Sequence, residues 1–422
     1  MALRDNRAIN DGDVLEREAP RLWHPLRNRN YLLLWSGQSI SVLGDQFYFI
    51  ALAWLTLQLT GSALALGTVL MVAAVPRAVL MLLGGAVSDR FSQRILMLLS
   101  DVLRGVLVGA LAVLVITSAV QLWQLYVVAL IFGAVDAVFY PASSAIVPAV
   151  VEEALLTPAN ALQQGSLQIS NLIGPVLAGL LIAFSSRAAG IGLAFAVDAA
   201  TFFISVLTLA LVTIRRSAPS EDDSANNLLR SIAAGLRYVW HDPVLRALLI
   251  VIAGIDPVVN GVFGVGLPLL ARVHFGGAAA LGIMSAGFGA GALAGIVGAG
   301  SMAPRHRGLF GAAVIALFAT GTILLPLMPS VALATILIAV MGSGTGFINV
   351  LLMPWMQTRA EPAMLGRVMS LIMLSSVGLT PLTYAAAGAV AAVNVSLLYL
   401  VGGAILLATT LFALLSPVRT ID

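Results

Sequence analysis

Seven ionisable side chains lie within the long apolar runs of this sequence: Asp45, Arg77, Asp101, Arg104, Asp136, Asp198 and Asp256. If those runs cross a membrane, a charge at the bilayer centre costs at least ~2.5–3.5 kcal/mol. Each of the seven should therefore be paired, neutralised by protonation or exposed to water. Five acids and two bases cannot all pair, so the remaining acids are candidates to bind and release protons.

Two pairings are suggested by position. Asp101 and Arg104 are three residues apart and share one face of a helix, so we expect a structural pair between them or with the preceding loop. Asp45 and Arg77 fall near mid-depth on adjacent antiparallel spans, which makes an ion pair geometrically possible. Such a pair would be either a static clamp or a switch that a proton breaks.

The other three acids, Asp136, Asp198 and Asp256, have no base within reach along the sequence. Asp198 lies nearer the outer half of its run and ranks below the others. Aromatic or amide side chains accompany Asp45, Asp136 and Asp256 at helical spacing. This arrangement suits a bulky, apolar, cationic ligand but also occurs in ordinary helix packing. The proton-coupling candidates are therefore Asp45, Arg77, Asp136 and Asp256, and the substrate-cavity candidates are Tyr48, Phe49, Phe139, Tyr140, Asn260 and Phe263.

Other kinds of chemistry find little support. The chain has no Cys, which excludes disulfides and thiolate sites. Its four His residues are scattered over loops and span ends and predict no metal site, and a chain whose 22 basic residues are all Arg has no lysine-containing phosphate loop for ATP. We expect no enzyme activity, no cofactor beyond a proton gradient as energy source, and no nucleic-acid partner. The expected partners are the lipid bilayer and a small-molecule substrate, with the chain acting as a monomer.

Membrane helices are the elements that must position these residues. Of the 422 residues, 60% are hydrophobic and 10% are charged, whereas soluble domains are about 45–50% apolar and about 25% charged. This composition excludes an ordinary soluble enzyme and a disordered chain, and it argues against a barrel of alternating strands. Apolar runs between turn signals give twelve spans of about 20 residues or more. The predicted fold class is an all-α polytopic membrane protein.

One long polar junction divides the spans into two sets of six. The predicted organisation is a cytoplasmic tail at 1–30, an N-terminal six-helix half at 31–213, a linker at 214–244, a C-terminal six-helix half at 245–415 and a tail at 416–422. Within the linker, Leu228, Ile232, Leu236 and Val239 recur at helical spacing. This spacing indicates either an amphipathic helix on the membrane surface or a solvated linker helix.

Arginine positions predict the orientation in the membrane. With twelve spans, 18 of the 22 Arg residues fall on the side that holds both chain ends, and only Arg187 and Arg272 fall on the other. The first residues also lack the apolar core of a cleaved signal peptide. We therefore expect a multi-pass protein of the bacterial inner membrane with both termini in the cytoplasm.

The two sets of six spans are weakly similar. Pro148 and Pro175 have counterparts in Pro354 and Pro381, and both pairs are separated by 206 residues. A parallel six-span repeat is the pattern of a transporter whose two halves rock against each other.

Several motifs carry a resemblance to a known family. The loop after the second span reads Gly85-Ala-Val-Ser-Asp89-Arg90-Phe-Ser-Gln-Arg94, the fifth span contains Gly174-Pro175-Val-Leu-Ala-Gly179, and Gln357-Thr-Arg359 and Gly366-Arg367 follow the tenth. These segments resemble the major facilitator superfamily: its loop signature, its exporter motif, and its branch of macrolide-efflux and enterobactin-exporting proteins. Ser92 and Gln93 depart from the loop pattern, and Ser170 and Ala178 stand where the exporter motif usually has Gly.

The resemblance implies the major facilitator fold and the export of a small amphiphilic molecule, drug-like or siderophore-like, by alternating access with proton antiport. It also implies that Asp89 latches onto the start of the eleventh span near Pro362, whereas a plain loop whose charges only set topology is the alternative. The gating or structural residues expected on these grounds are Gly85, Asp89, Arg90, Arg94, Asp101, Arg104, Gly174, Pro175, Gly179, Arg359, Gly366 and Arg367.

Two other functions remain open at this point. An uptake symporter or facilitator has the same fold, and the Gly-Pro pattern of the fifth span disfavours it without excluding it. A ligand sensor with no transport cycle would not need unpaired acids at membrane depth, so the acids argue against that function.

Overall fold

Long helices make up nearly all of the regular structure. The computed structural model describes residues 21–90, 92–184, 187–213, 236–301, 306–359 and 362–421, with the backbone alone described at 82–90, 187, 188, 301 and most positions of 353–373. Throughout these ranges every regular element is helical, and twelve helical segments are long and apolar enough to cross a membrane. The predicted all-α polytopic fold class is confirmed.

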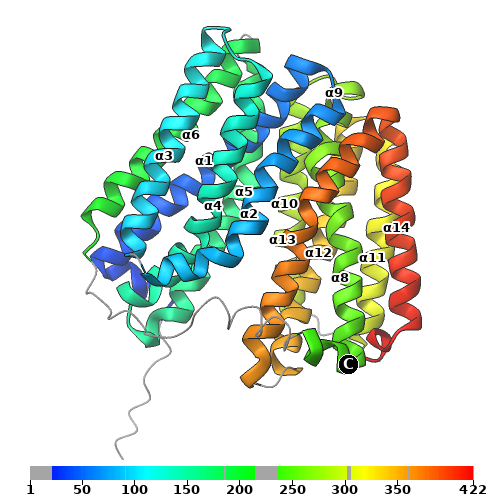
Figure 1. Ribbon diagram of the computed structural model, residues 1–422. Helices are drawn as coiled ribbons and strands as arrows, with labels where there is room; N and C mark the ends of the chain where they lie inside the picture. The colour runs from blue at the N-terminus through cyan, green and yellow to red at the C-terminus, as the bar shows by residue number, and fades with distance from the viewer. Residues whose placement is uncertain are drawn as a thin grey trace, which may run out of the picture.

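The helices fall into two groups of six spans, drawn from blue to green and from green to red in Figure 1. The first group comprises α1 (Arg29–Thr60), α2 (Ala63–Arg90), α3 (Gln93–Ile116), α4 (Leu122–Val150), α5 (Leu156–Phe184) and α6 (Arg187–Leu211). The second comprises α8 (Pro243–Gly261) with η3 (Val262–Gly266) and α9 (Leu267–Val273), then α10 (Ala278–Ser301), α11 (Arg307–Leu324), α12 (Val331–Arg359), α13 (Pro362–Val393) and α14 (Val395–Leu415). The seventh span, expected as one continuous run, is interrupted by the π turn η3.

Short polar residues and glycine define several helix ends. The Asn28 side chain accepts hydrogen bonds from the backbone N–H groups of Asn30 and Tyr31 at the start of α1. Gly61 ends the same helix with φ 66°, a conformation that a residue without a Cβ adopts at little cost. Asp242 caps α8 in the same way as Asn28 caps α1, ahead of Pro243 at the first helical position.

Each group packs as a bundle, and two helix pairs join the bundles. In the N-terminal half α6 packs against α1 and α3, and α2 packs against α4; in the C-terminal half the closest neighbours are α10 with α12 and α11 with α14. Between the halves, α2 packs against α13 and α5 against α10. The two halves diverge towards the lower end of Figure 1, where residues near both chain termini lie. We call this end the terminal end and the other the distal end.

Glycines bring the two halves into contact near the distal end. An added Cβ at Gly67 of α2 would lie 2.8 Å from the Cα of Gly388 of α13, and one at Gly179 of α5 would lie 3.0 Å from the Cα of Gly282 of α10. Such small residues let helix backbones approach closely. Arg272 of α9 adds a polar contact by donating a hydrogen bond to the backbone carbonyl of Leu57 near the end of α1.

The apolar cores show the same asymmetry between the two ends. Near the distal end Leu57 and Leu66 of the N-terminal half share one buried cluster with Val265 and Ala391 of the C-terminal half. At the terminal end the clusters belong to one half each: that around Tyr31, Met97 and Ile146 is confined to the N-terminal half, and those around Val239 and around Leu248 are confined to the C-terminal half. The halves are therefore closed against each other at the distal end.

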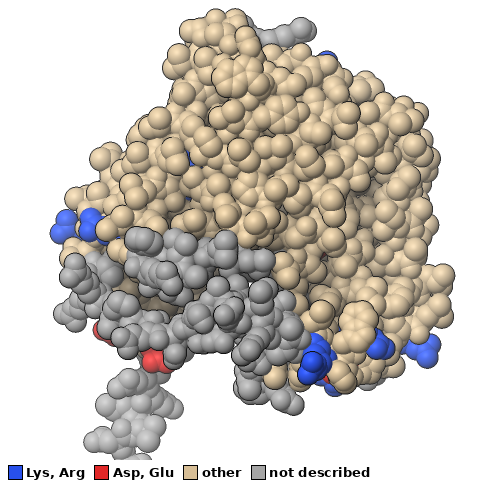
Figure 2. Space-filling model, viewed as in Figure 1, with Lys and Arg blue, Asp and Glu red and all other residues tan. Residues whose placement is uncertain are grey.

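Surface charge also differs between the terminal end and the rest of the molecule. Figure 2 shows Arg side chains gathered towards the terminal end, below a broad belt that is almost free of charge. The linker, predicted to hold either an amphipathic surface helix or a solvated helix, lies mostly outside the described residues, because 214–235 are not described. In the helical turn that follows, Val239 is buried against Leu245, Val368 and Leu371, while Leu236 is exposed.

The distal contact should be sensitive to side-chain size. In Gly282→Val, the added atoms would meet the backbone of Pro175 and Gly179, so we expect the distal ends of the two halves to separate. Because the chain has no Cys, spin labels at Phe184→Cys and Leu327→Cys, both highly exposed positions, would report their distance by electron spin resonance.

The matched control is Gly300→Val, since a Cβ at that position would have no atom of another described helix within 4 Å. We expect a longer mean label distance in Gly282→Val than in Gly300→Val. Equal distributions in the two variants would show that the glycine contact does not hold the distal end closed.

Candidate functional site

A buried guanidinium joins three helices of the N-terminal half. Arg104 of α3 forms ion pairs with Asp101 on its own helix, at 2.6 Å, and with Asp136 of α4, at 3.3 Å. The other oxygen of Asp101 accepts a hydrogen bond of 2.7 Å from the hydroxyl of Ser205 on α6. The relative exposures are 0% for Asp101, 2% for Arg104 and 7% for Asp136. Charges this deeply buried depend on their partners, because removing one leaves the others uncompensated.

Aromatic rings surround the same guanidinium. The Arg104 Cζ atom lies 4.0 Å from the ring centre of Phe139, 4.7 Å from that of Phe202 and 5.7 Å from that of Phe132. Rings at these distances attract a cation through their faces. Phe139, expected to line a substrate cavity, is therefore part of the wall around Arg104, and it is itself buried.

The predicted pairing of Asp101 with Arg104 is confirmed, and the expectation that Asp136 has no base is wrong. Arg104 and Asp136 are 32 residues apart and meet because α3 packs against α4. Sequence position gave no sign of this contact. Asp136 remains a proton-coupling candidate, now as one of two acids that share a single arginine.

Asp45 and Arg77 do not form the ion pair that their depth allowed. One carboxylate oxygen of Asp45 and the Nε of Arg77 are buried without any hydrogen-bond partner. The Arg77 guanidinium lies instead 4.8 Å from the ring centre of Tyr140, which is 44% exposed. Asp45 is nevertheless within electrostatic reach of Arg104 and Arg77.

Asp198 of α6 is the acid that ranked below the others on sequence grounds. It is fully buried, and neither of its carboxylate oxygens has a hydrogen-bond partner. Its Oδ1 lies 2.7 Å from where a Cβ would stand at Gly44 of α1, and its charge is within electrostatic reach of Asp45. The buried hydroxyl of Tyr48 also lacks a partner. Gly37 and Gly44, seven residues apart, both face α6, and this spacing is the signal that could have placed Asp198 against α1.

The remaining cavity candidates of α1 have different surroundings. Tyr48 is buried, with its ring stacked on Phe132 at 4.3 Å, so it belongs to the bundle core. Phe49 is 47% exposed and touches Tyr48 edge to face, with 5.6 Å between ring centres. Of these two aromatic residues only Phe49 is free to contact a ligand in this conformation.

In the C-terminal half Asp256 of α8 stands apart from the other acids. One of its carboxylate oxygens accepts a hydrogen bond from the hydroxyl of Ser376 on α13. The amide of Asn260 is turned back onto the backbone carbonyl of Asp256, at 3.0 Å, and Phe263 packs against Phe288 with 4.7 Å between ring centres. Of the ion pairs formed by described residues, none includes Asp256.

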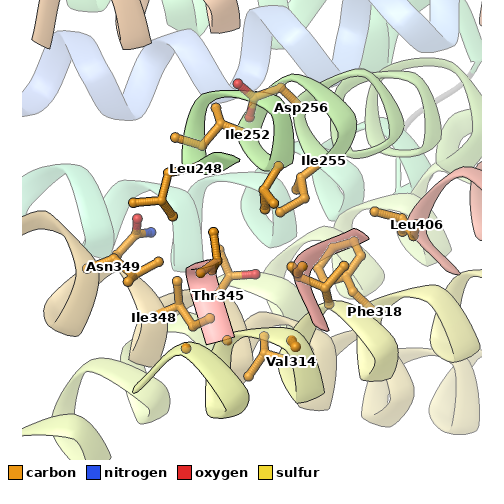
Figure 3. Close-up of a pocket in the computed structure, with 18 of the residues that line it drawn as sticks. Leu248, Ile252, Ile255, Asp256, Val314, Phe318, Thr345, Ile348, Asn349 and Leu406 are labelled. Carbon is orange, nitrogen blue, oxygen red and sulfur yellow. The ribbon is translucent and has the colours of Figure 1, made fainter. Parts of the chain in front are cut away.

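An apolar cavity of about 300 Å³ lies beside Asp256, inside the C-terminal half. Figure 3 shows Asp256 at its edge, above Ile252 and Ile255 of the same helix, with Phe318, Thr345 and Asn349 across from them. Among the described residues no group of three or more His, Cys, Asp or Glu could hold a metal ion.

The motif residues divide into those with described contacts and those without. Arg94 donates hydrogen bonds to the carbonyls of Leu209 and Ala210 at the C-terminal end of α6, where a cation is favourable. Arg359 pairs with Asp242, at 3.2 Å, on an exposed surface. For the predicted latch and its neighbours only the backbone is described; these residues are Gly85, Asp89, Arg90, Gly366 and Arg367.

The Gly-Pro motif of α5 lies at two helix contacts. A Cβ at Gly174 would lie 2.6 Å from the Cβ of Gln46 on α1, and Gly179 faces Gly282 of α10. Pro175 lies between them within the helix, and its carbonyl faces Gly282. The motif thus faces both a neighbour within its own half and the other half.

Comparison with known proteins finds one family over most of the chain. The sequence model described as Major Facilitator Superfamily matches residues 34–382. The chain is 31% identical over 227 residues to the multidrug efflux pump Tap of Mycolicibacterium fortuitum, covering 52% of this chain and 53% of that protein. It is 25% identical over 221 residues to macrolide efflux protein A of Streptococcus pyogenes, covering 52% and 54%. These matches thus span about half the length of the curated relatives.

Solved structures match the fold over almost the whole chain. The nucleoside transporter NupG superposes with a TM-score of 0.71 at 13% identity, covering 92% of this chain and 98% of that one. A bacterial homologue of the iron transporter ferroportin, solved in an inward-facing state, superposes with a TM-score of 0.73 at 16% identity over 92% and 98%. At these identities the likeness concerns the fold alone.

The buried cluster around Arg104 should dominate the stability of the N-terminal half. Replacing this residue in Arg104→Leu leaves two buried carboxylates without their cation, so we expect the free energy of unfolding to fall by about 3–5 kcal/mol. Unfolding of the purified protein in detergent, followed by circular dichroism, measures this loss.

The matched control is Arg359→Ala, which breaks an exposed pair and should cost less than about 1 kcal/mol. Equal losses in the two variants would mean that the buried cluster contributes no more than a surface ion pair.

Proposed function

Since the chain belongs to the major facilitator superfamily, we propose that it exports a small amphiphilic molecule from a bacterial cell by alternating access, in exchange for protons. The observation that carries the proton exchange is the excess of acids at membrane depth in the N-terminal half. Among the described residues, three buried acids, Asp101, Asp136 and Asp198, and the half-buried Asp45 stand with two cations, Arg77 and Arg104, in one bundle. Export is supported by the two efflux relatives described above.

The orientation proposed for this cycle rests on the arginine count. With twelve spans, the sequence predicts 18 of the 22 Arg residues on the side of the chain ends, and cytoplasmic loops carry the excess of basic residues. The terminal end therefore faces the cytoplasm of the inner membrane. The closed distal end and the separate cores of the terminal end then correspond to the conformation that admits substrate from the cytoplasm.

Proton binding follows from charge balance around Arg104. This cation interacts electrostatically with Asp101, Asp136 and Asp45, but it has direct ion pairs with only two of them. A third carboxylate at the same depth, without a cation of its own, is favoured in its protonated form. A proton that moves between Asp45 and Asp136 would change which acid Arg104 holds, and so couple protonation to the packing of α1 against α3 and α4.

The energy source in this proposal is the proton gradient, and no other cofactor takes part. The chain works as a monomer in the lipid bilayer, without a nucleic-acid partner, and carries out no covalent chemistry on its substrate. Asp256, the acid of the other half, provides a second protonation site that faces a different set of helices.

Proton coupling is tested by neutral variants in proteoliposomes with an imposed pH gradient. We expect Asp45→Asn, Asp136→Asn or Asp256→Asn, one or more of them, to abolish gradient-driven export, because an amide cannot release a proton. Asp101→Asn should instead lower expression, since it breaks the closest pair of the buried cluster. Substrate-dependent thermal stabilisation should survive in the coupling variants.

The control for these variants is Glu152→Gln, an exposed acid at the terminal end, which should transport normally. Normal pumping by all three Asn variants would remove the basis for proton antiport. Accumulation inside cells, in place of extrusion, would identify an uptake symporter.

The orientation is tested by labelling single cysteines in intact cells. A membrane-impermeant maleimide should label Leu327→Cys, which lies at the distal end, and should label Glu152→Cys only after the membrane is opened. The reverse pattern would overturn the proposed topology.

A further inference from the structure

The cavity in the C-terminal half lies within one bundle and apart from the contact between the halves. It is lined by α8, α11, α12 and α14, and by Val418 of the short helix η5 (Pro417–Thr420). Along α8 its wall extends from Leu248 to Val259, or about 16 Å of helix. Packed protein interiors contain few voids larger than a water molecule. A space of about 300 Å³ is therefore large enough to be a site for a bound molecule.

Most of the wall of this cavity is apolar and suits an apolar body. Aliphatic side chains such as Ile252, Ile315 and Ile348 form most of its surface, and Phe318 lies against it. Phe318 is itself part of an aromatic group, with ring centres 6.2 Å from Phe263 and 6.4 Å from Phe288. Ligand sites commonly combine such a surface with a few placed polar groups.

Two polar side chains at the cavity have unused capacity. Asp256 forms no ion pair with any described residue, and Ser376 donates the one hydrogen bond given to its carboxylate. Asn349 is exposed, and its amide forms no hydrogen bond with the described residues around it. Both residues line the same cavity, with Asp256 at its edge (Figure 3). Thr345 differs, because its hydroxyl already donates to the backbone of its own helix.

The two charged groups at the cavity lie at different depths. Asp256 is thirteen residues into α8, about 20 Å along the helix from its start at the terminal end. Arg307 is the first residue of α11 at the terminal end, and its Nε atom is buried without a hydrogen-bond partner among the described residues. The charge that a ligand meets inside the membrane is therefore the negative one of Asp256.

We infer that this cavity binds an elongated lipophilic amine, with its ammonium group at Asp256 and its apolar body between α8, α11 and α12. The site lies inside the C-terminal half, so it binds without requiring the two halves to close around the ligand. The inference deepens the proposed function, on which it rests for the direction of transport, by giving a chemical class for the substrate. Asn349 supplies a second, neutral contact to the ligand.

Three probes with the same body and different head groups test the charge preference. They are 4-phenylbutylamine, 4-phenylbutanol and 4-phenylbutyrate, titrated onto the full-length protein in lipid nanodiscs by calorimetry, with empty nanodiscs subtracted. No gradient is applied, so binding is measured whether or not the protein exports. We expect the amine to bind about tenfold more tightly than the alcohol, which corresponds to about 1.4 kcal/mol, and the carboxylate most weakly.

Two variants then locate the site. A side chain at Gly311 would project towards Ile348 Cδ1, 3.6 Å from its Cβ, across the cavity. Gly311→Leu should therefore fill the space and abolish binding of both amine and alcohol. Gly300→Leu, at a position where a Cβ would have no atom of another described helix within 4 Å, should bind as the parent does. Asp256→Asn should bind the alcohol unchanged and lose the preference for the amine.

The outcomes separate this site from the transport cycle. Unchanged amine binding in a folded Gly311→Leu would overturn the site, and Ile348→Phe provides the same test if that variant does not fold. A carboxylate that binds as tightly as the amine would overturn the ligand class. Amine binding that follows the expected pattern, in a protein that fails to pump, would contradict the proposed export and support this binding site.

Discussion

The arrangement of the N-terminal half depends on one buried cation. Arg104 is buried, so its charge is tolerated only because Asp101 and Asp136 lie against it and aromatic rings cover its faces. These partners come from two helices, and Ser205 adds a third through Asp101. Because the Arg104 charge is stable only beside these partners, it keeps α3, α4 and α6 in fixed positions relative to one another. The bundle can therefore move as a unit, which a transporter built from two rocking halves requires.

The two halves differ in how they use polar residues. In the N-terminal half acids and bases are packed together, with unpartnered atoms on Asp45, Tyr48 and Asp198. The C-terminal half has a single acid at membrane depth among its described residues, next to an apolar cavity. The similarity of the six-span units therefore concerns backbone and helix contacts. In the proposed cycle the first half would handle protons and the second would hold the apolar part of the substrate.

How much of this could be predicted from the sequence depended on the distance between the residues involved. Spans, helix caps and the Asp101–Arg104 pair are local features, so composition and spacing predicted them. The contact of Arg104 with Asp136 joins residues of two helices, and the faces on which they meet are decided by the packing of the whole bundle. For the same reason equal depth did not bring Asp45 to Arg77, and the burial of Asp198 against Gly44 was missed. The π turn of the seventh span and the cavity of the C-terminal half have no local signature at all.

The glycine contacts at the distal end have a thermodynamic consequence. A joint made of backbone against backbone immobilises no rotamers, because glycine has no side chain to order. When Gly67 leaves Gly388 and Gly179 leaves Gly282, little conformational entropy is released at these positions. The free energy of parting is then set mainly by lost dispersion contacts, which are individually small and fall off steeply with distance. The contact between the halves therefore resists the first fraction of an ångström of separation most strongly, and its resistance is lost within a short distance.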